Sequence, residues 1–154
     1  MKRIYAMMMG TLLSVMGGSA IASANGEGPA AHASSAATVV LRHTHVGTIL
    51  TTSSGLTLYE FTRDGSRADS CVKIKECAKF WPPLRSTGRP TAGAGVKSSL
   101  LSTITLAGGV KQVTYAGHAL YTYSADRPGS TGYVGVNAFG GNWDALSATG
   151  AAVK

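Results

Sequence analysis

The sequence predicts a mainly β domain made of two similar β-hairpin-containing repeats that form one compact domain, with at most a short helix near residues 74–80. Two observations support this fold class. The chain matches itself at a constant shift of 62 residues, and a fixed internal period is the signature of a repeated unit. Short runs rich in Thr, Val, Leu and Tyr alternate with Gly, Ser and Asp, which is typical of strands separated by turns.

The repeat is visible without any gap. Between residues 47–84 and 109–146, nine of 38 positions are identical, more than this composition gives by chance. The matched pairs are Gly47 and Gly109, Thr52 and Thr114, Gly55 and Gly117, Leu58 and Leu120, Tyr59 and Tyr121, Asp64 and Asp126, Val72 and Val134, Trp81 and Trp143, and Leu84 and Leu146. A duplicated unit is the simplest explanation.

The two repeats define the expected organisation of the domain. We expect a single domain over residues 38–150, with repeat one at about 38–84 and repeat two at about 100–146. A Gly- and Pro-rich stretch, residues 85–99, reads as the linker between them. Residues 25–37 are rich in Gly, Ala and Ser and are expected to form a flexible arm.

Each repeat is expected to contain a hairpin. Strand-like runs at 48–52 and 56–61 flank a turn at Ser53-Ser54-Gly55. The runs at 111–115 and 119–123 flank the equivalent turn at Ala116-Gly117-His118. The glycines at these turns supply the positive φ that a tight connection often needs. Segments 38–41 and 102–106 are expected to add one strand to each unit.

The N-terminus reads as an export signal. Lys2 and Arg3 precede an apolar stretch, and Ala22-Ser23-Ala24 has the small-x-small form of a cleavage site. We therefore expect a signal peptide at residues 1–24 and a periplasmic or secreted product. There is no cysteine near this site, so a lipid anchor is not expected, and no later apolar run is long enough to span a membrane.

Charge points to a class of partner. Without Lys2 and Arg3, 12 basic and 7 acidic residues remain, a net charge of +5, which favours anionic surroundings. The chain places several cations close together, namely Lys73, Lys75, Lys79, Arg85 and Arg89, opposed locally by Asp69 and Glu76. Such a patch could attract acidic polymers or lipid headgroups. The alternative is that these cations form a solvated face that only keeps the protein soluble. Nucleic acid is disfavoured because no binding motif accompanies the charge.

The two cysteines of the exported region are expected to form a disulfide. Cys71 and Cys77 would meet in an oxidising compartment, where pairing is the default. Residues six apart in a straight helix lie beyond disulfide reach, so a bond excludes one regular helix over 71–77. Metal binding or a redox-active dithiol by this pair is the weaker alternative.

An aromatic and acidic motif occurs once in each repeat. Tyr59 and Phe61 share a strand face, as do Tyr121 and Tyr123, and an aspartate follows each pair. These residues either bind a polar ligand or pack between the halves while the aspartates close turns. The structural interpretation is favoured, because a fold-defining hairpin is needed in each copy whereas a catalytic set is needed once. The motif set is Tyr59, Phe61, Asp64, Tyr121, Tyr123, Asp126, Trp81 and Trp143.

Metal binding and catalysis are weaker hypotheses. His43 and His45 would share a strand face and suit copper or zinc, with His118 as a further candidate. No cofactor is predicted, and a metal ion is retained only as an alternative. The common catalytic signatures are missing from the sequence. A hydrolase that uses Asp64 and Asp126 as a carboxylate pair is therefore the weakest alternative.

The motif resembles that of a known family. Tyr59-Glu60-Phe61-Thr62-Arg63-Asp64 and Tyr121-Thr122-Tyr123-Ser124-Ala125-Asp126 are similar to the Y-x-[FWY]-x-x-D motif of a bacterial family of secreted repeats and lipoproteins, whose function is not established. The similarity covers about residues 46–150, including Trp81-Pro82-Pro83-Leu84 and Asn137-Ala138-Phe139-Gly140-Gly141-Asn142-Trp143. It implies export and a repeated fold, and it lends no catalytic residues.

The sequence therefore favours one function and keeps two alternatives. The leading hypothesis is an exported, non-enzymatic binding or interaction module of the cell envelope, whose partner is an envelope component or a small ligand. The first alternative is a metal- or redox-linked envelope protein that uses its histidines and cysteines. The second is the aspartate hydrolase.

Overall fold

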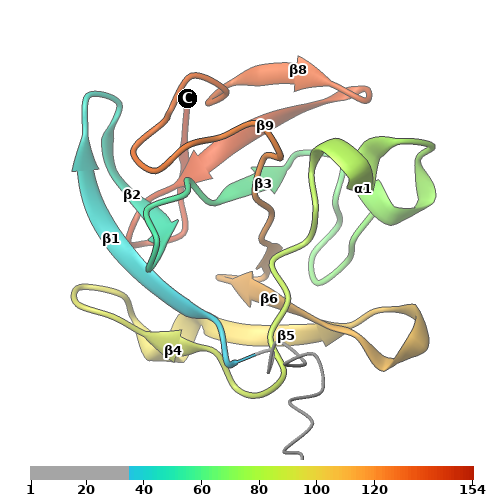
Figure 1. Ribbon diagram of the computed structural model, residues 1–154, viewed down its shortest axis with the longest axis horizontal. Helices are drawn as coiled ribbons and strands as arrows, with labels where there is room; N and C mark the ends of the chain where they lie inside the picture. Colours follow the sequence, from blue (N-terminus) through green and yellow to red (C-terminus); the bar gives the residue numbers. More distant parts are fainter. Residues whose placement is uncertain (1–34) are drawn as a thin grey trace, which may run out of the picture. The chain divides into compact units, whose positions relative to one another are not determined.

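The computed structural model describes residues 35–154 (Figure 1). The predicted signal peptide and most of the predicted arm lie outside these residues. The strands are β1 (Thr38–Thr44), β2 (Gly47–Thr52), β3 (Tyr59–Phe61), β4 (Thr91–Ala92), β5 (Leu101–Thr105), β6 (Lys111–Tyr115), β7 (His118–Ala119), β8 (Val136–Ala138), β9 (Gly141–Leu146) and β10 (Ala152–Val153). The short helices are η1 (Cys71–Lys73), α1 (Cys77–Phe80), η2 (Ser98–Leu100) and η3 (Ala107–Gly109). The mainly β prediction is confirmed.

The start of each repeat folds as an antiparallel pair. β1 pairs with β2, from Val39 opposite Thr52 to Thr44 opposite Gly47. β5 pairs with β6 in the second copy, and both pairs are visible in Figure 1. The predicted turn glycines, Gly55 and Gly117, have positive φ values of 92° and 88°, where a side chain would be strained.

The two halves exchange strands. β3 of the first half leaves its own hairpin and pairs antiparallel with β9 of the second, with Tyr59 opposite Ala145 and Phe61 opposite Trp143 (Figure 1). In return, Tyr121 pairs with Pro83 of the first half. At the centre, the amides of Tyr59 and Tyr121 donate to each other's carbonyl oxygens, both at 2.9 Å. Equivalent residues that bond reciprocally indicate a local two-fold relation between the halves.

The predicted hairpins are therefore only partly right. The run 56–61 contacts β2, because the Leu58 amide donates to the Leu50 carbonyl at 3.1 Å. Its regular strand, β3, begins only at Tyr59 and pairs with β9. The run 119–123 gives only the two-residue β7 before the chain crosses to the other half. The sequence pattern found the extended segments and their pairing beside each turn. It missed the pairing of each second run with the opposite half, since pairing between distant segments leaves no local signal.

Prolines explain why the two halves do not form identical sheets. Residues 79–84 are equivalent to β9, yet they contain α1's last turn and only an isolated bridge at Pro83. Pro82 and Pro83 have no amide hydrogen to donate to a ladder. In the second copy the same positions are Asp144 and Ala145, and β9 forms with β8 on its other edge. The sequence analysis did not anticipate the β8–β9 hairpin.

Two segments outside the predicted repeats are ordered by pairing. The predicted linker, residues 85–99, contains β4, which pairs parallel to β1, and the Gly93 amide donates to the Val39 carbonyl at 2.7 Å. β10 lies beyond the expected end at residue 150 and pairs with β9. Both segments cover strand edges that would otherwise be open.

Two apolar clusters fill the interior of the described residues. The first joins the paired strands of both halves through Val39, Leu50, Leu58, Leu101, Val113, Tyr115, Leu120 and Leu146. The second is aromatic and contains Tyr59, Phe61, Cys71, Cys77, Trp81, Ala119, Tyr121 and Trp143. Each cluster draws on both repeats, so neither half has a complete core of its own.

Candidate functional site

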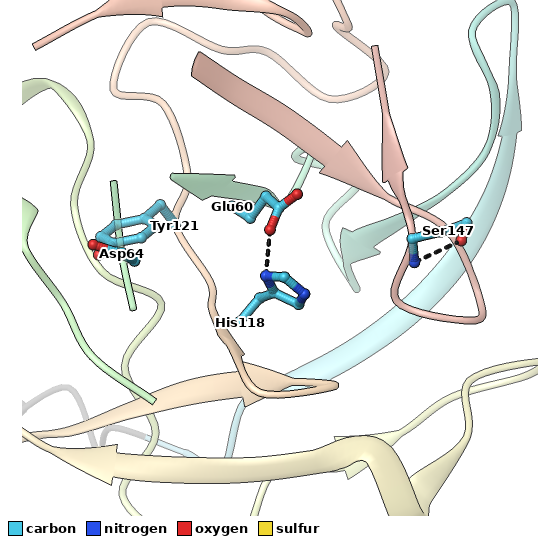
Figure 2. Close-up of polar contacts among 6 residues, drawn as sticks. Glu60, Asp64, His118, Tyr121 and Ser147 are labelled. Carbon is cyan, nitrogen blue, oxygen red and sulfur yellow. Dashed lines mark hydrogen bonds and ion pairs between the residues drawn. The ribbon is translucent and has the colours of Figure 1, made fainter. Parts of the chain in front are cut away.

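The motif tyrosines and aspartates bond across the two halves. The Tyr59 hydroxyl donates to Asp126 Oδ2 at 2.8 Å, and the Tyr121 hydroxyl donates to Asp64 Oδ2 at 2.6 Å. Each tyrosine thus finds the aspartate of the other repeat and not its own. The turn beside Asp64 is also fixed, because the Ser70 amide donates to Asp64 Oδ1 at 2.6 Å. Figure 2 shows Tyr121 against Asp64.

The rings of the motif form one stack with the two tryptophans. Trp81 and Trp143 lie parallel, with centroids 4.0 Å apart and planes at 5°. Phe61 stacks on Trp143 at 4.2 Å, and Tyr123 contacts Trp81 at 4.5 Å. Tyr59 and Tyr121 meet the edges of Trp81 and Trp143 at 5.1 and 5.2 Å. Such offset and edge contacts stabilise beyond the burial of the rings.

Burial keeps the hydroxyl groups of the two motif tyrosines protonated. Removal from water, reinforced by the neighbouring aspartate, raises the pKa of both Tyr59 and Tyr121, so both hydroxyls remain donors. Burial also raises the pKa of Asp64 and Asp126, against the opposing effect of the tyrosine hydrogen bonds. Tyr59, Tyr121 and both tryptophans are almost inaccessible to solvent. These hydrogen bonds therefore link the two halves. Asp64 and Asp126, the carboxylate pair of the hydrolase hypothesis, each accept a hydrogen bond from a tyrosine hydroxyl.

The cysteines form the predicted disulfide. Cys71 and Cys77 are bonded, and their Cα atoms lie 5.3 Å apart. The prediction that residues 71–77 do not form one regular helix is confirmed. η1 ends at Lys73, and α1 begins at Cys77, directly after Glu76, whose φ is 66°. Both sulfurs are buried against the aromatic cluster.

The candidate metal-binding histidines have three different partners. His43 Nδ1 lies 2.7 Å from Thr48 Oγ1. His45 lies in the β1–β2 turn, not on the strand, and contacts Thr131 Oγ1. His118 Nδ1 pairs with Glu60 Oε2, as Figure 2 shows. Within residues 35–154 no group of three or more His, Cys, Asp or Glu side chains is placed to hold a metal ion.

A charged cluster forms where β3 of the first half pairs with β9 of the second. Glu60 is opposite Asp144 in the β3–β9 register, and both are buried, at 7% and 1% exposure. Burial raises the pKa of both carboxyls. His118 and Lys154 lower the pKa of Glu60 while the Asp144 charge raises it, and Lys154 lowers the pKa of Asp144. The repeat equivalents of Glu60, Asp144 and His118 are uncharged, namely Thr122, Pro82 and Leu56.

A second one-sided feature is a basic face, which we define by six exposed cations. Its members line a series of adjoining hollows and are Lys73, Lys75, Lys79, Arg85, Arg89 and Lys111. Glu76 is the single acidic residue lining these four hollows, and it pairs with Lys79 at 3.3 Å. Asp69, expected to oppose the patch, is buried and accepts the Val72 amide at 2.9 Å.

Neighbouring hollows of the basic face share lining residues. A hollow of about 540 Å³ lies between Arg85 and Lys111, with Ser86 and Thr87 beside them. It shares Arg85 and Val110 with a smaller apolar hollow of about 200 Å³, and Lys111 with a third that includes Arg89. The apolar hollow shares Val72 and Ala78 with the fourth, at the disulfide loop. Polar, cationic and apolar walls therefore follow one another along this face.

The repeat shows that this face is not a requirement of the fold. The residues equivalent to the six cations are Gly135, Asn137, Gly141, Ser147, Ala151 and Ile49. The fold-defining tyrosines, aspartates and tryptophans recur in both copies, whereas these charges do not. The sequence analysis found five of the six cations and missed Lys111, Glu60 and Asp144. Comparing the copies for differences in charge, in addition to identities, would have found all three.

Comparison with known proteins agrees with this architecture. The fold is that of a duplicated β domain in which the two halves share their sheet and their apolar clusters. A family model described as a secreted repeat of unknown function matches residues 40–85 and again residues 102–147. The two matches are offset by the same 62 residues as the internal repeat, and the chain belongs to this family. No curated protein and no solved structure matches the chain. Within the described residues, no helix is long and apolar enough to cross a membrane.

Proposed function

We propose that this protein is an exported, non-enzymatic binding module of the cell envelope that holds an acidic ligand on its basic face. The observation that carries the proposal is the set of four hollows that share lining residues and are lined by six cations and a single acid. Membership of a family of secreted repeats supports export.

The geometry of the hollow between Arg85 and Lys111 suits an anionic group. The two segments are joined there, because the Ser86 amide donates to the Lys111 carbonyl at 3.0 Å. The cations therefore project from a fixed backbone, which lowers the cost of ordering them on binding. Clustered charge of one sign also attracts an acidic ligand from a distance and makes its association salt-dependent.

The division of labour between the motif and the basic face favours binding over catalysis. The motif aspartates accept hydrogen bonds from tyrosine hydroxyls of the opposite half, which supports a structural role for them. The side chains of the basic face are guanidinium and ammonium groups, which recognise phosphate, sulfate or carboxylate by charge and hydrogen bonding.

The test is a titration of the exported protein with short-chain polyphosphate, followed by calorimetry at two salt concentrations. We expect saturable binding that weakens as salt is added. Arg85→Ser with Lys111→Ile, each copying the residue of the other repeat, should weaken binding by about tenfold or more, about 1.4 kcal/mol. Arg127→Ala, a change of one charge outside the hollows, should alter affinity by less than about twofold. Equal affinity of wild type and the double variant would refute the proposed site.

A further inference from the structure

The loop closed by the disulfide exposes apolar side chains. Among the described residues, the large apolar side chains that are strongly exposed are Val72, at 45%, and Phe80, at 40%. Val72 follows Cys71 directly, and Phe80 ends α1. Exposed apolar groups gathered on one element mark an interaction surface more often than scattered ones do.

The segment that carries these apolar groups also carries lysines. Lys73, Lys75 and Lys79 come from the same segment and are all exposed. Val72 and the three lysines line one hollow, and Lys79 Nζ lies 5.9 Å from the centre of the Phe80 ring. Phe80 is in turn 6.1 Å from the ring of Phe139. The segment therefore exposes two apolar side chains together with three lysines.

The second copy uses the same segment differently. Residues equivalent to Lys73 and Lys75 are Gly135 and Asn137, and the residue equivalent to Phe80 is Asn142. There the chain forms β8 and β9, which pair with each other. The combination of lysines and exposed apolar side chains is thus a feature of the first copy and not of the repeat.

An anionic bilayer matches both parts of this surface. Apolar side chains gain from leaving water at the headgroup boundary, while each lysine near anionic lipid strengthens binding by about fivefold. Lysines extend their charge toward the headgroups and leave the stem in apolar contact. A hydrated acidic polymer would satisfy the lysines alone and give Val72 and Phe80 no place to bury.

The disulfide makes the surface ready to dock. The bond between Cys71 and Cys77 anchors both ends of the loop in the aromatic cluster. The Trp81 amide donates to the Cys77 carbonyl at 2.8 Å, which holds the end of α1. Ordering the loop before contact reduces the entropy lost on binding.

We propose that residues 71–80 form a docking element for the surface of an anionic lipid bilayer. Val72 and Phe80 enter the headgroup boundary, and Lys73, Lys75 and Lys79 contact lipid phosphates. This inference rests on the proposed function, because Lys73, Lys75 and Lys79 belong to the basic face. It deepens that function by assigning lipid recognition to side chains other than Arg85 and Lys111.

Vesicle co-sedimentation of the full exported protein tests the proposal. We expect binding to vesicles of phosphatidylglycerol and phosphatidylethanolamine, and little binding to neutral phosphatidylcholine. Val72→Thr with Phe80→Asn, which leaves every charge in place, should weaken vesicle binding by about tenfold. Val46→Thr, in the β1–β2 turn, is the matched control and should bind as wild type does.

The same variants separate this inference from the proposed function. The Val72 and Phe80 double variant should bind polyphosphate as wild type does, and a near-ultraviolet circular dichroism spectrum will show whether its aromatic core is intact. Vesicle binding that is unchanged in this variant, or equal for neutral and anionic vesicles, overturns the docking element. Polyphosphate binding with no vesicle binding overturns it too and leaves the proposed function standing. Vesicle binding without polyphosphate binding would instead refute the site at Arg85 and Lys111.

Discussion

At the scale of single residues, the motif works as a reciprocal lock. Tyr59 and Tyr121 each donate to the aspartate of the opposite repeat, while their backbones bond to each other. A buried acceptor that loses its donor keeps its desolvation cost. The tyrosine of each motif therefore contacts the aspartate of the other repeat, although the sequence of a single motif indicates only a strand followed by a turn.

Loss of one tyrosine hydroxyl should be measurable. Tyr121→Phe removes the donor to Asp64 and should lower the free energy of unfolding by about 1–3 kcal/mol. Tyr59→Phe should cost a similar amount because its partner Asp126 is in the equivalent place. Urea denaturation followed by tryptophan fluorescence gives both values.

A double-mutant cycle supplies the control for this lock. Tyr121→Phe and Asp64→Asn should be non-additive by about 0.5–3 kcal/mol because they remove the same hydrogen bond. Tyr59→Phe combined with Asp64→Asn removes members of different hydrogen bonds and should be closer to additive. Coupling between Tyr59 and Asp64 that exceeds the coupling between Tyr121 and Asp64 would contradict the crossed arrangement.

The buried carboxyls should make the protein more stable in mild acid than at neutral pH. Burial raises the folded-state pKa of Glu60, Asp64, Asp126 and Asp144. A carboxyl with a raised folded pKa binds its proton more tightly when folded, so its contribution is present below the unfolded pKa and is lost as pH rises through the folded pKa. The melting temperature should therefore increase as pH is lowered from 7 toward 5.

Asp144→Asn tests one source of this behaviour. The amide keeps the shape of the side chain and removes a charge that lies opposite Glu60 on the neighbouring strand. The variant should melt a few degrees higher than wild type at pH 7 and should show a weaker dependence on pH. Glu76→Gln, at an exposed acid paired with Lys79, should leave the dependence unchanged. A lower melting temperature for Asp144→Asn at pH 7 would show that the charge is stabilising in place.

At the scale of elements, equivalent segments have taken different structures. Residues 71–80 of the first copy form a disulfide loop and α1, while the equivalent residues of the second form β8 and the start of β9. Prolines at 82 and 83 remove ladder donors from the first copy. β8 covers one edge of β9 in the second copy, whereas the loop of the first copy exposes its lysine side chains.

Removing the disulfide should destabilise the domain moderately. The loop it closes is short, so the entropy it removes from the unfolded chain corresponds to about 2 kcal/mol. Cys71→Ser with Cys77→Ser should lower the free energy of unfolding by about this amount, and reducing agent should have the same effect on wild type and none on the variant. Unchanged stability after reduction would mean that packing of α1 against the aromatic cluster suffices to hold the loop.

At the scale of the whole molecule, the sequence indicated the class of fold and not its connections. The shift of 62, the turn glycines and the strand-like runs were readable because they are local or repeated. The pairing of β3 with β9 was not, since the partners are far apart and neither run encodes its neighbour. For the candidate site, the patch of Lys73, Lys75, Lys79, Arg85 and Arg89 was visible as a cluster along the chain. Lys111 joins it only through folding, as Asp144 joins Glu60.

The exchange of strands makes the two repeats dependent on each other. β3 has its ladder partner in the second half, Trp81 of the first half stacks on Trp143 of the second, and both apolar clusters mix residues of the two copies. A hairpin without a covered apolar face is marginal in water. A single repeat would expose the part of each cluster that it contributes and leave a motif tyrosine and aspartate without partners.

Separated halves should therefore be unfolded alone and should fold on mixing. Fragments ending and beginning at residues 95 and 96, within the loop after β4, divide the chain between the repeats. Each fragment alone should lack the near-ultraviolet circular dichroism that stacked tryptophans produce, and should give a poorly dispersed NMR spectrum. Mixing equal amounts should restore both signals, and Tyr121→Phe in the second fragment should weaken the association by about tenfold, the equivalent of about 1.4 kcal/mol. Cooperative unfolding of either fragment alone would show that one repeat suffices, and that the crossed tyrosine and aspartate pairs join two domains that are already folded.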